Sequence, residues 1–295
     1  MGFELLSVNY LLPQRLFSLV SSVGMLGVLK RADLVALMQP SALVESASAR
    51  EQSERLTAAA VRCKLLSETT VDSRELRLAV DVDRIQSVEA FRNLLQEYLL
   101  GVCVESADHF ILNQVAAWYA VQNEKVLGLT KSEFERQFNG QLYSGASERK
   151  FSEQPGVTTW IVWAEFLGWG WPTPFGTVSN VRLAPDATLR IRPLLEGTIR
   201  NADKVIPFGT FMAELSNIWP ELDGGILFEQ CWQASRGNEV RGNRPSLMLS
   251  TALRTLHNLG ELELIDRPDA SETWALFPAQ SHIGRVSHIR RKAVA

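Results

Sequence analysis

Cysteine and histidine are scarce in this chain of 295 residues, and their spacing matches no metal-binding pattern. The three cysteines (Cys63, Cys103 and Cys231) are odd in number, far apart and set among apolar residues. This indicates buried, reduced thiols in a reducing compartment and not disulfides. The four histidines lack the C-x-x-C or H-x-x-x-H partner spacing of structural zinc. We therefore expect no metal site and no bound cofactor.

The sequence also lacks an excess of positive charge. Thirty Lys and Arg residues stand against 33 Asp and Glu, which gives a formal net charge of −3. This balance excludes a protein that coats DNA with a generally basic surface, so any nucleic-acid contact must be a local patch.

Long uninterrupted hydrophobic runs are missing as well. The segment 5–29 is apolar, but Asn9, Pro13, Gln14 and Arg15 interrupt it. No run therefore reaches the roughly 18 apolar residues that a membrane span requires, and no charged stretch precedes the segment as in a signal peptide. We expect a cytoplasmic protein without membrane attachment.

Catalytic motifs are absent too, because G-x-x-x-x-G-K-[ST], G-x-G-x-x-G and G-x-S-x-G do not occur. Asp108, Glu148 and Lys150 are similar in type to the two acids and one lysine of metal-dependent nucleases, in which carboxylates hold Mg²⁺. That site requires its acids on adjacent strands, whereas Asp108 falls on a predicted helix and Glu148 in a Gly/Ser-rich loop. We predict no catalytic residues and no enzyme activity, with a divergent nuclease as an alternative.

What the sequence does contain is a series of helical periods followed by short alternating segments. This predicts a mainly α-helical protein with short β-hairpins (α+β), with winged helix-turn-helix modules at both ends and a helical middle domain. The predicted domains are 1–83, 84–205 and 206–295, the last with a basic tail. Within them we expect helices starting at Pro13 and over 30–38, 50–64, 208–219, 224–234 and 246–258, hairpins over 65–80 and 261–277, and a strand over 186–195.

Tryptophans are concentrated in the middle domain, where four of the eight lie between positions 160 and 171. Such rings can stack on bases or sugars. However, Trp160, Trp163 and Leu167 fall at helical i, i+3, i+7 spacing, which favours a helix buried against its neighbours. We predict that this segment is core.

The helix predicted over 246–258 has two distinct faces. The apolar side is formed by Leu249, Ala252, Leu253, Leu256 and Leu259, and short polar residues surround an arginine on the other side. Such a face suits a DNA groove, because small hydroxyls permit close approach and Arg can bind guanine or phosphate. The predicted DNA-binding residues are Arg244, Ser250, Thr251, Arg254, His257, Asn258, Arg267, Arg290, Arg291 and Lys292. A solvated helix face has the same pattern, so a protein-interaction scaffold without DNA contact is an alternative.

Several segments together resemble the DpdG family of bacterial Dpd clusters, which insert 7-deazaguanine derivatives into DNA and restrict foreign DNA. They are "LLPQRLFSLVSSVG", "WAEFLGWG", "ELDGGILFEQCW", "LSTALRTLHNLGELEL" and "RVSHI". The resemblance spans most of the chain and supplies no catalytic residues. It implies an accessory protein on the restriction side of such an antiviral system, acting on DNA with helicase-like and nuclease-like partner subunits.

Overall fold

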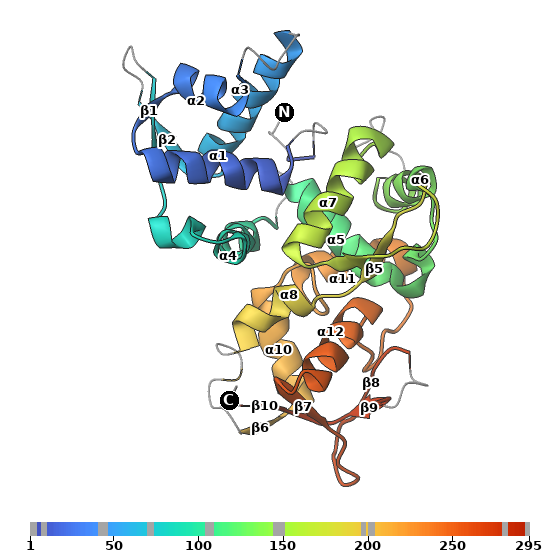
Figure 1. Cartoon of the computed structure of the whole chain (residues 1–295). Coiled ribbons are helices and arrows are strands. Elements are labelled where there is room, and N and C mark those ends of the chain that lie inside the picture. The colour runs from blue at the N-terminus through green and yellow to red at the C-terminus, as the bar shows by residue number, and fades with distance from the viewer. Residues whose placement is uncertain are drawn as a thin grey trace.

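A computed structural model describes residues 5–6, 11–40, 47–69, 74–103, 109–143, 151–195, 199, 204–278 and 283–292 (Figure 1). The fold is mixed α+β, with small antiparallel sheets packed among helices. Buried side chains from the N-terminal, middle and C-terminal parts join one hydrophobic cluster. Among the described helices, none has the length and hydropathy that a membrane crossing requires.

The N-terminal part contains three helices and a three-stranded sheet with the order β1-β3-β2. Its elements are α1 (Pro13–Leu26), β1 (Leu29–Lys30), α2 (Arg31–Met38), α3 (Ala47–Arg62), β2 (Leu66–Glu68) and β3 (Glu75–Leu78). The predicted helices and the hairpin of β2 and β3 are confirmed, whereas β1 was not predicted. The helical period over 30–38 predicts Leu34, Leu37 and Met38 on the inward side of α2. For Leu37 this is wrong: it is 50% exposed and Val35 is buried instead, because the buried side of α2 faces α3.

The middle part is helical, with one two-stranded sheet. Its elements are η2 (Val82–Ile85), α4 (Val88–Leu100), α5 (Phe110–Gln122), η3 (Asn123–Val126), α6 (Lys131–Leu142), η4 (Glu153–Val157), α7 (Thr158–Leu167), β4 (Gly170–Pro172), β5 (Leu183–Pro185), α8 (Thr188–Ile191) and η5 (Arg192–Leu194). The strand predicted over 186–195 is wrong, because this segment forms α8 and η5. The Asp186 carboxylate accepts a 2.6 Å hydrogen bond from the Thr188 N–H, which starts a helical turn directly after β5.

The prediction that the tryptophan segment is core is confirmed for three of its four rings and is wrong for Trp171, which is 46% exposed. Trp160, Trp163 and Trp169 are completely buried. The Trp163 indole N–H donates to the Leu11 carbonyl at 2.8 Å, which ties α7 to the chain before α1. Trp160 packs edge-on against Tyr119 of α5, with ring centroids 5.1 Å apart. These rings therefore hold the middle part together, and they are not a stacking platform for a ligand.

The C-terminal part pairs its strands differently from the prediction. Its elements are β6 (Val205–Pro207), α10 (Phe208–Ile218), α11 (Ile226–Arg236), α12 (Leu247–Asn258), β7 (Leu262–Ile265), β8 (Trp274–Ala275), β9 (Arg285–Val286) and β10 (His288–Arg291). A hairpin over 261–277 is wrong, because β7 pairs with β10 and β8 pairs with β9. The predicted basic tail is the central strand of the sheet β6-β10-β7, since Ile289 is fully buried opposite Leu264.

The middle and C-terminal parts are joined through their core. Arg190 of α8 forms an ion pair with Glu221, with an N···O distance of 2.7 Å, and both side chains are completely buried. The Arg190 guanidinium also lies 4.0 Å from the ring centroid of Trp219. Elements η2 and β6 span the two predicted domain boundaries. The division into three domains and the winged-helix assignment of the two ends stay predictions.

Candidate nucleic-acid interface

The helix predicted to contact DNA, α12, is in contact with other elements on several sides and keeps a partly exposed face. It packs against β7 on one side and against α8, β5, α5 and η3 on others (Figure 1). Ser246 caps its first turn, because its Oγ accepts a hydrogen bond from the Leu249 N–H. Contacts on several sides leave little of this helix for a DNA groove.

Two predicted DNA-binding residues of α12 have structural partners. Ser250 is fully buried, and its Oγ accepts a 2.9 Å hydrogen bond from the Phe277 N–H. The Arg254 guanidinium donates to the carbonyl of Ile283 at 2.9 Å, to that of Pro278 at 3.0 Å and to that of Phe277. The expectation that Ser250 lies on an exposed face is wrong, whereas Arg254 is half-buried. Both side chains bond to backbone groups of the chain that returns over α12.

The remaining predicted residues around α12 are divided between structural and exposed positions. The His257 ring Nδ1 accepts a 3.1 Å hydrogen bond from the Leu264 N–H and so holds β7 against the helix. Thr251 is half-buried, whereas Asn258 and Arg267 are exposed. The expectation that Leu259 lies on the inward side is wrong: it is 57% exposed, because α12 ends at Asn258.

The predicted cationic cluster at the C-terminal end lies on and beside the central strand β10. The Arg290 Nε donates to the Glu263 carboxylate at 2.9 Å, and this bond lowers the pKa of Glu263. Arg291 and Lys292 are half-buried and line a recess with Arg192, Glu261 and neighbouring apolar residues. A carboxylate therefore neutralises part of the charge that the sequence assigned to DNA.

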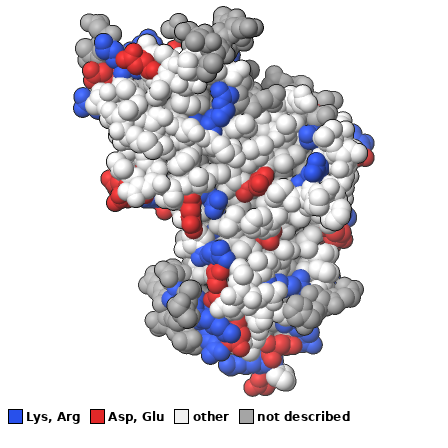
Figure 2. All heavy atoms as spheres, in the orientation of Figure 1, with Lys and Arg blue, Asp and Glu red and all other residues white. Residues whose placement is uncertain are grey.

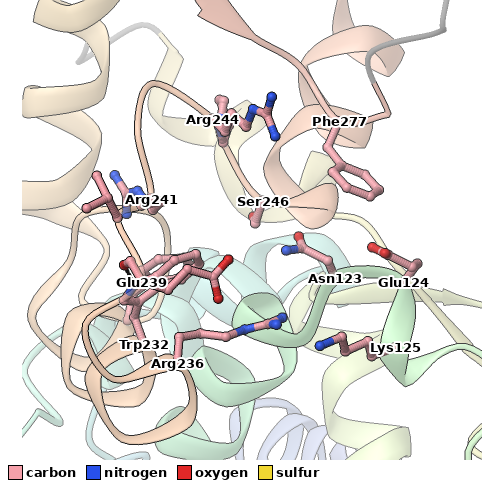
Figure 3. A pocket seen from close by; sticks show the side chains of 13 residues that line it. Asn123, Glu124, Lys125, Trp232, Arg236, Glu239, Arg241, Arg244, Ser246 and Phe277 are labelled. Carbon is pink, nitrogen blue, oxygen red and sulfur yellow. Dashed lines mark hydrogen bonds between the residues drawn. The ribbon is translucent and has the colours of Figure 1, made fainter.

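One predicted residue, Arg244, lies in a recess that the sequence did not predict. This basic pocket has a volume of about 230 Å³ and lies between η3, α11 and the segment that leads into α12 (Figure 3). Its lining comprises Asn123, Glu124, Lys125, Phe228, Trp232, Arg236, Glu239, Val240, Arg241, Arg244, Pro245, Ser246 and Phe277. Figure 3 shows the ends of Arg236 and Lys125 pointing toward one another from opposite sides.

Hydrogen bonds fix the walls of the basic pocket. The Asn123 Oδ1 accepts a 2.7 Å bond from the Leu247 N–H, which attaches η3 to the start of α12. The Arg236 guanidinium donates to the Val121 carbonyl at 3.2 Å. The Trp232 indole N–H donates to the Glu239 carbonyl at 3.1 Å, which holds the segment after α11 over the ring. Three segments distant in sequence are thereby held in one arrangement.

A buried carboxylate supports the pocket floor. Both Asp223 oxygens accept 2.6 Å hydrogen bonds from Ser246, one from its N–H and one from its hydroxyl. Burial raises the pKa of Asp223, since an ionised carboxylate loses its hydration there. Because Asp223 is fully buried and bonded to Ser246, its role is to position the start of α12 and the pocket floor.

The charges in the basic pocket differ in availability. Arg241 is paired with Glu229 at 2.8 Å and lies over the Phe228 ring. Lys125 and Arg244 are exposed, and neither side chain forms an ion pair within the described part of the chain. On the face of the molecule in Figure 2, basic and acidic side chains are interspersed. The two unpaired cations of the pocket are therefore a local feature of a mixed surface.

Only some of the residues that line this pocket could be predicted from the sequence. The arginine-rich stretch that includes Arg236, Arg241 and Arg244 is visible in the sequence. Lys125 and Trp232 were missed, because Lys125 lies more than 100 positions before the stretch and Trp232 follows the ordinary period of an amphipathic helix. Only the bond between Asn123 and Leu247 shows that η3 joins the site.

The structure offers little for catalysis. Asp108, Glu148 and Lys150 lie outside the described residues. In the described ranges, no three His, Cys, Asp or Glu residues come together as metal ligands. The Cys63 Sγ lies 3.5 Å from the His109 Nε2 in the interior, but the His109 Nδ1 accepts a hydrogen bond from the Leu5 N–H. A neutral His109 ring therefore carries its proton on Nε2 and cannot take one from the thiol.

The comparison with known protein families agrees with the resemblance seen in the sequence. No curated protein and no solved structure matches the chain significantly. The model of the family described as DpdG-like matches residues 3–270, which is most of the chain. The chain therefore belongs to the DpdG-like family.

Proposed function

We propose that this protein is a DNA-binding adaptor of a Dpd restriction system, without catalytic activity of its own, and that the basic pocket around Arg244 is its DNA contact. Membership in the DpdG-like family indicates an accessory protein of a Dpd system. The main support for the DNA contact is that two exposed cations, Lys125 and Arg244, line the same recess as an aromatic ring, Trp232. Neither cation forms an ion pair among the described residues. Cations attract phosphates, and aromatic rings add contact with bases.

The order of elements supports an adaptor. At the N-terminal end, three helices and a sheet with β3 between β1 and β2 follow the order of a winged helix. At the C-terminal end, the last strand β10 likewise lies between β6 and β7. Such modules dock either DNA or protein. Because α12 is covered by the middle part, the C-terminal module contacts DNA through the pocket beside the helix and not through the helix itself.

The test is retention of labelled DNA by the purified protein at about 50 mM salt and again at about 200 mM salt. We expect retention that falls with salt and that is weakened by Arg244→Ala. The same incubation with Mg²⁺ should leave the DNA intact. No retention at low salt would refute the DNA contact, and Mg²⁺-dependent cleavage would refute the non-enzymatic assignment.

A specific observation favours the second candidate, a protein-docking scaffold that does not touch DNA. The connection between β4 and β5 exposes large apolar side chains, with Phe175 at 79% and Val178 at 80% exposed, and Trp171 at 46% beside them. Exposed apolar groups that lie together mark protein contacts. Co-purification of another subunit of the same system that is lost in Phe175→Ser, together with absent DNA retention, would establish the scaffold in place of the adaptor.

A further inference from the structure

We infer that the basic pocket holds one unpaired nucleotide of a single DNA strand, with the base on Trp232 and a flanking phosphate on Arg244 and Lys125. This inference rests on the proposed DNA contact and specifies its substrate. It follows from three properties of the pocket, which are its concave shape, its aromatic floor and its combination of both charge signs.

The shape favours a single nucleotide over a duplex. A duplex presents its phosphates along a convex surface, whereas the pocket is a recess of about 230 Å³ enclosed by η3, α11 and the segment before α12. The cations Lys125 and Arg244 stand at its edge, on opposite sides of the recess (Figure 3). A strand that crosses this edge can place a phosphate on the cations and turn one base inward, as proteins that bind single strands do.

The floor provides a stacking surface. Trp232 is half-buried, and its ring is nearly parallel to that of Phe228, at 19° with centroids 6.2 Å apart. The Arg236 guanidinium lies 5.9 Å from the Trp232 ring centroid, so a stacked base would also meet this cation. Its indole N–H is already bonded to the Glu239 carbonyl, so the ring is held in place before any ligand arrives. A fixed ring loses little conformational freedom on binding, which favours stacking of a base.

The carboxylates distinguish a nucleotide from a plain phosphate. Glu124 and Glu239 are exposed members of the lining, and Figure 3 shows the Glu239 carboxylate directed into the recess beside Arg236. Carboxylates repel phosphate but accept hydrogen bonds from the exocyclic amino groups of bases, such as N4 of cytosine. A nucleotide with an amino-bearing base can bind the cations through its phosphate and the carboxylates through its amino group. A thymine nucleotide has no amino group and can bind only the cations.

The experiment compares fluorescein-labelled dC12, dT12 and a mixed-sequence 12-bp duplex by anisotropy. We expect dC12 to bind more tightly than dT12 and the duplex. Trp232→Leu should weaken dC12 by about 5- to 100-fold, the range of one lost base stack. Glu239→Ala keeps the backbone carbonyl that Trp232 uses and should abolish the preference for dC12 over dT12. Trp171→Leu, which removes an exposed tryptophan outside the pocket, is the matched control and should bind like wild type.

Photo-crosslinking gives a second measurement that does not depend on variants. A 12-mer with one 5-iododeoxycytidine, irradiated with wild-type protein, should attach to the peptide that contains Trp232. If DNA binds and depends on Arg244 while Trp232→Leu has no effect and the crosslink lies elsewhere, the nucleotide pocket is refuted and the DNA contact stands. If none of the three probes binds, the DNA contact fails, and the nucleotide pocket fails with it.

Discussion

Substitution of Arg254 distinguishes most clearly between a structural role for this residue and a role in reading a DNA groove. The structural role predicts a loss of stability, whereas the groove-reading role predicts almost none. A solvated arginine on a recognition helix can be removed with a change of less than about 0.5 kcal/mol in the free energy of unfolding. In the structure, however, the Arg254 guanidinium donates to the carbonyls of Phe277, Pro278 and Ile283. Arg254→Ala should therefore destabilise the fold.

The magnitude follows from the number and kind of the lost bonds. A hydrogen bond from a charged donor contributes about 1.5–3 kcal/mol. Arg254 is half-buried, so water replaces part of each lost bond, and the contributions of three acceptors do not add fully. We expect Arg254→Ala to lower the free energy of unfolding by about 2–4 kcal/mol. The free energy of unfolding of Arg254→Lys, which has a single compact ammonium, should lie between those of wild type and Arg254→Ala.

Urea denaturation followed by circular dichroism measures this directly. Arg244→Ala is the matched control, because Arg244 is exposed and forms no ion pair among the described residues, and its midpoint should stay near that of wild type. Arg254→Ala with wild-type stability and weakened DNA binding would refute the structural role. That result would instead support α12 as the helix that binds in a DNA groove.

Three further predictions concern the core. Trp160→Ala and Trp163→Ala should each lower the free energy of unfolding by about 3–5 kcal/mol in the same assay, because both rings are completely buried, whereas Trp171→Ala should change it little. In the native protein the half-buried Cys103 should react first with a thiol reagent, since Cys63 and Cys231 are buried and burial raises the pKa of Cys231 to about 12. After unfolding without reductant, all three thiols should react. A single reactive thiol would contradict this prediction. Because burial raises the pKa of Asp223 in the folded state, its contribution to stability is present at low pH and is lost as the pH rises through that pKa. Asp223→Asn should therefore gain stability relative to wild type as the pH rises above about 4, the ordinary pKa of an aspartate, and parallel pH profiles of the two proteins would contradict this.

The elements that the sequence predicts best are those whose local signals agree with their packing. Thr130 followed three positions later by Glu133 is the sequence pattern of a capping box, and it starts α6 with both reciprocal hydrogen bonds present. Trp160 and Trp163 follow the helical period and are buried. In these cases one periodic pattern determines both the element and its inward side.

Strand pairing in the C-terminal part could not be read in the same way. The alternation over 261–277 favours a hairpin, but β7 pairs with β10 across an intervening pair of strands. Pairing depends on contacts distant in sequence, and the charge of Arg290 conceals a central strand because its partner, Glu263, lies opposite it on the adjacent strand β7. Charge in a sequence does not distinguish a tail from a strand.

The site residues show the same limit. A polar helix face is the same in sequence whether water, DNA or another part of the chain covers it, and on α12 the chain around Phe277 and Ile283 covers it. Arg244 was predicted from its local charge and lies in the basic pocket. Lys125 and Trp232 carried no such signal, since only the tertiary fold brings η3 to α11 and the start of α12.

The measurement that tests the central claim most directly is the salt dependence of DNA affinity in two double variants. Lys125→Ala/Arg244→Ala removes two cations of the basic pocket that form no ion pair among the described residues, and Asn258→Ala/Arg267→Ala removes two exposed groups, one at the end of α12 and one after β7. Each phosphate contact contributes about 0.7–0.9 to the slope of log K against log salt. Because Lys125 and Arg244 are assigned to the same flanking phosphate, the pocket variant should lose about 0.7–0.9 units of slope, and the α12 variant should keep the wild-type slope. An unchanged slope in the pocket variant, or a reduced slope only in the α12 variant, would contradict the assignment of DNA binding to the pocket.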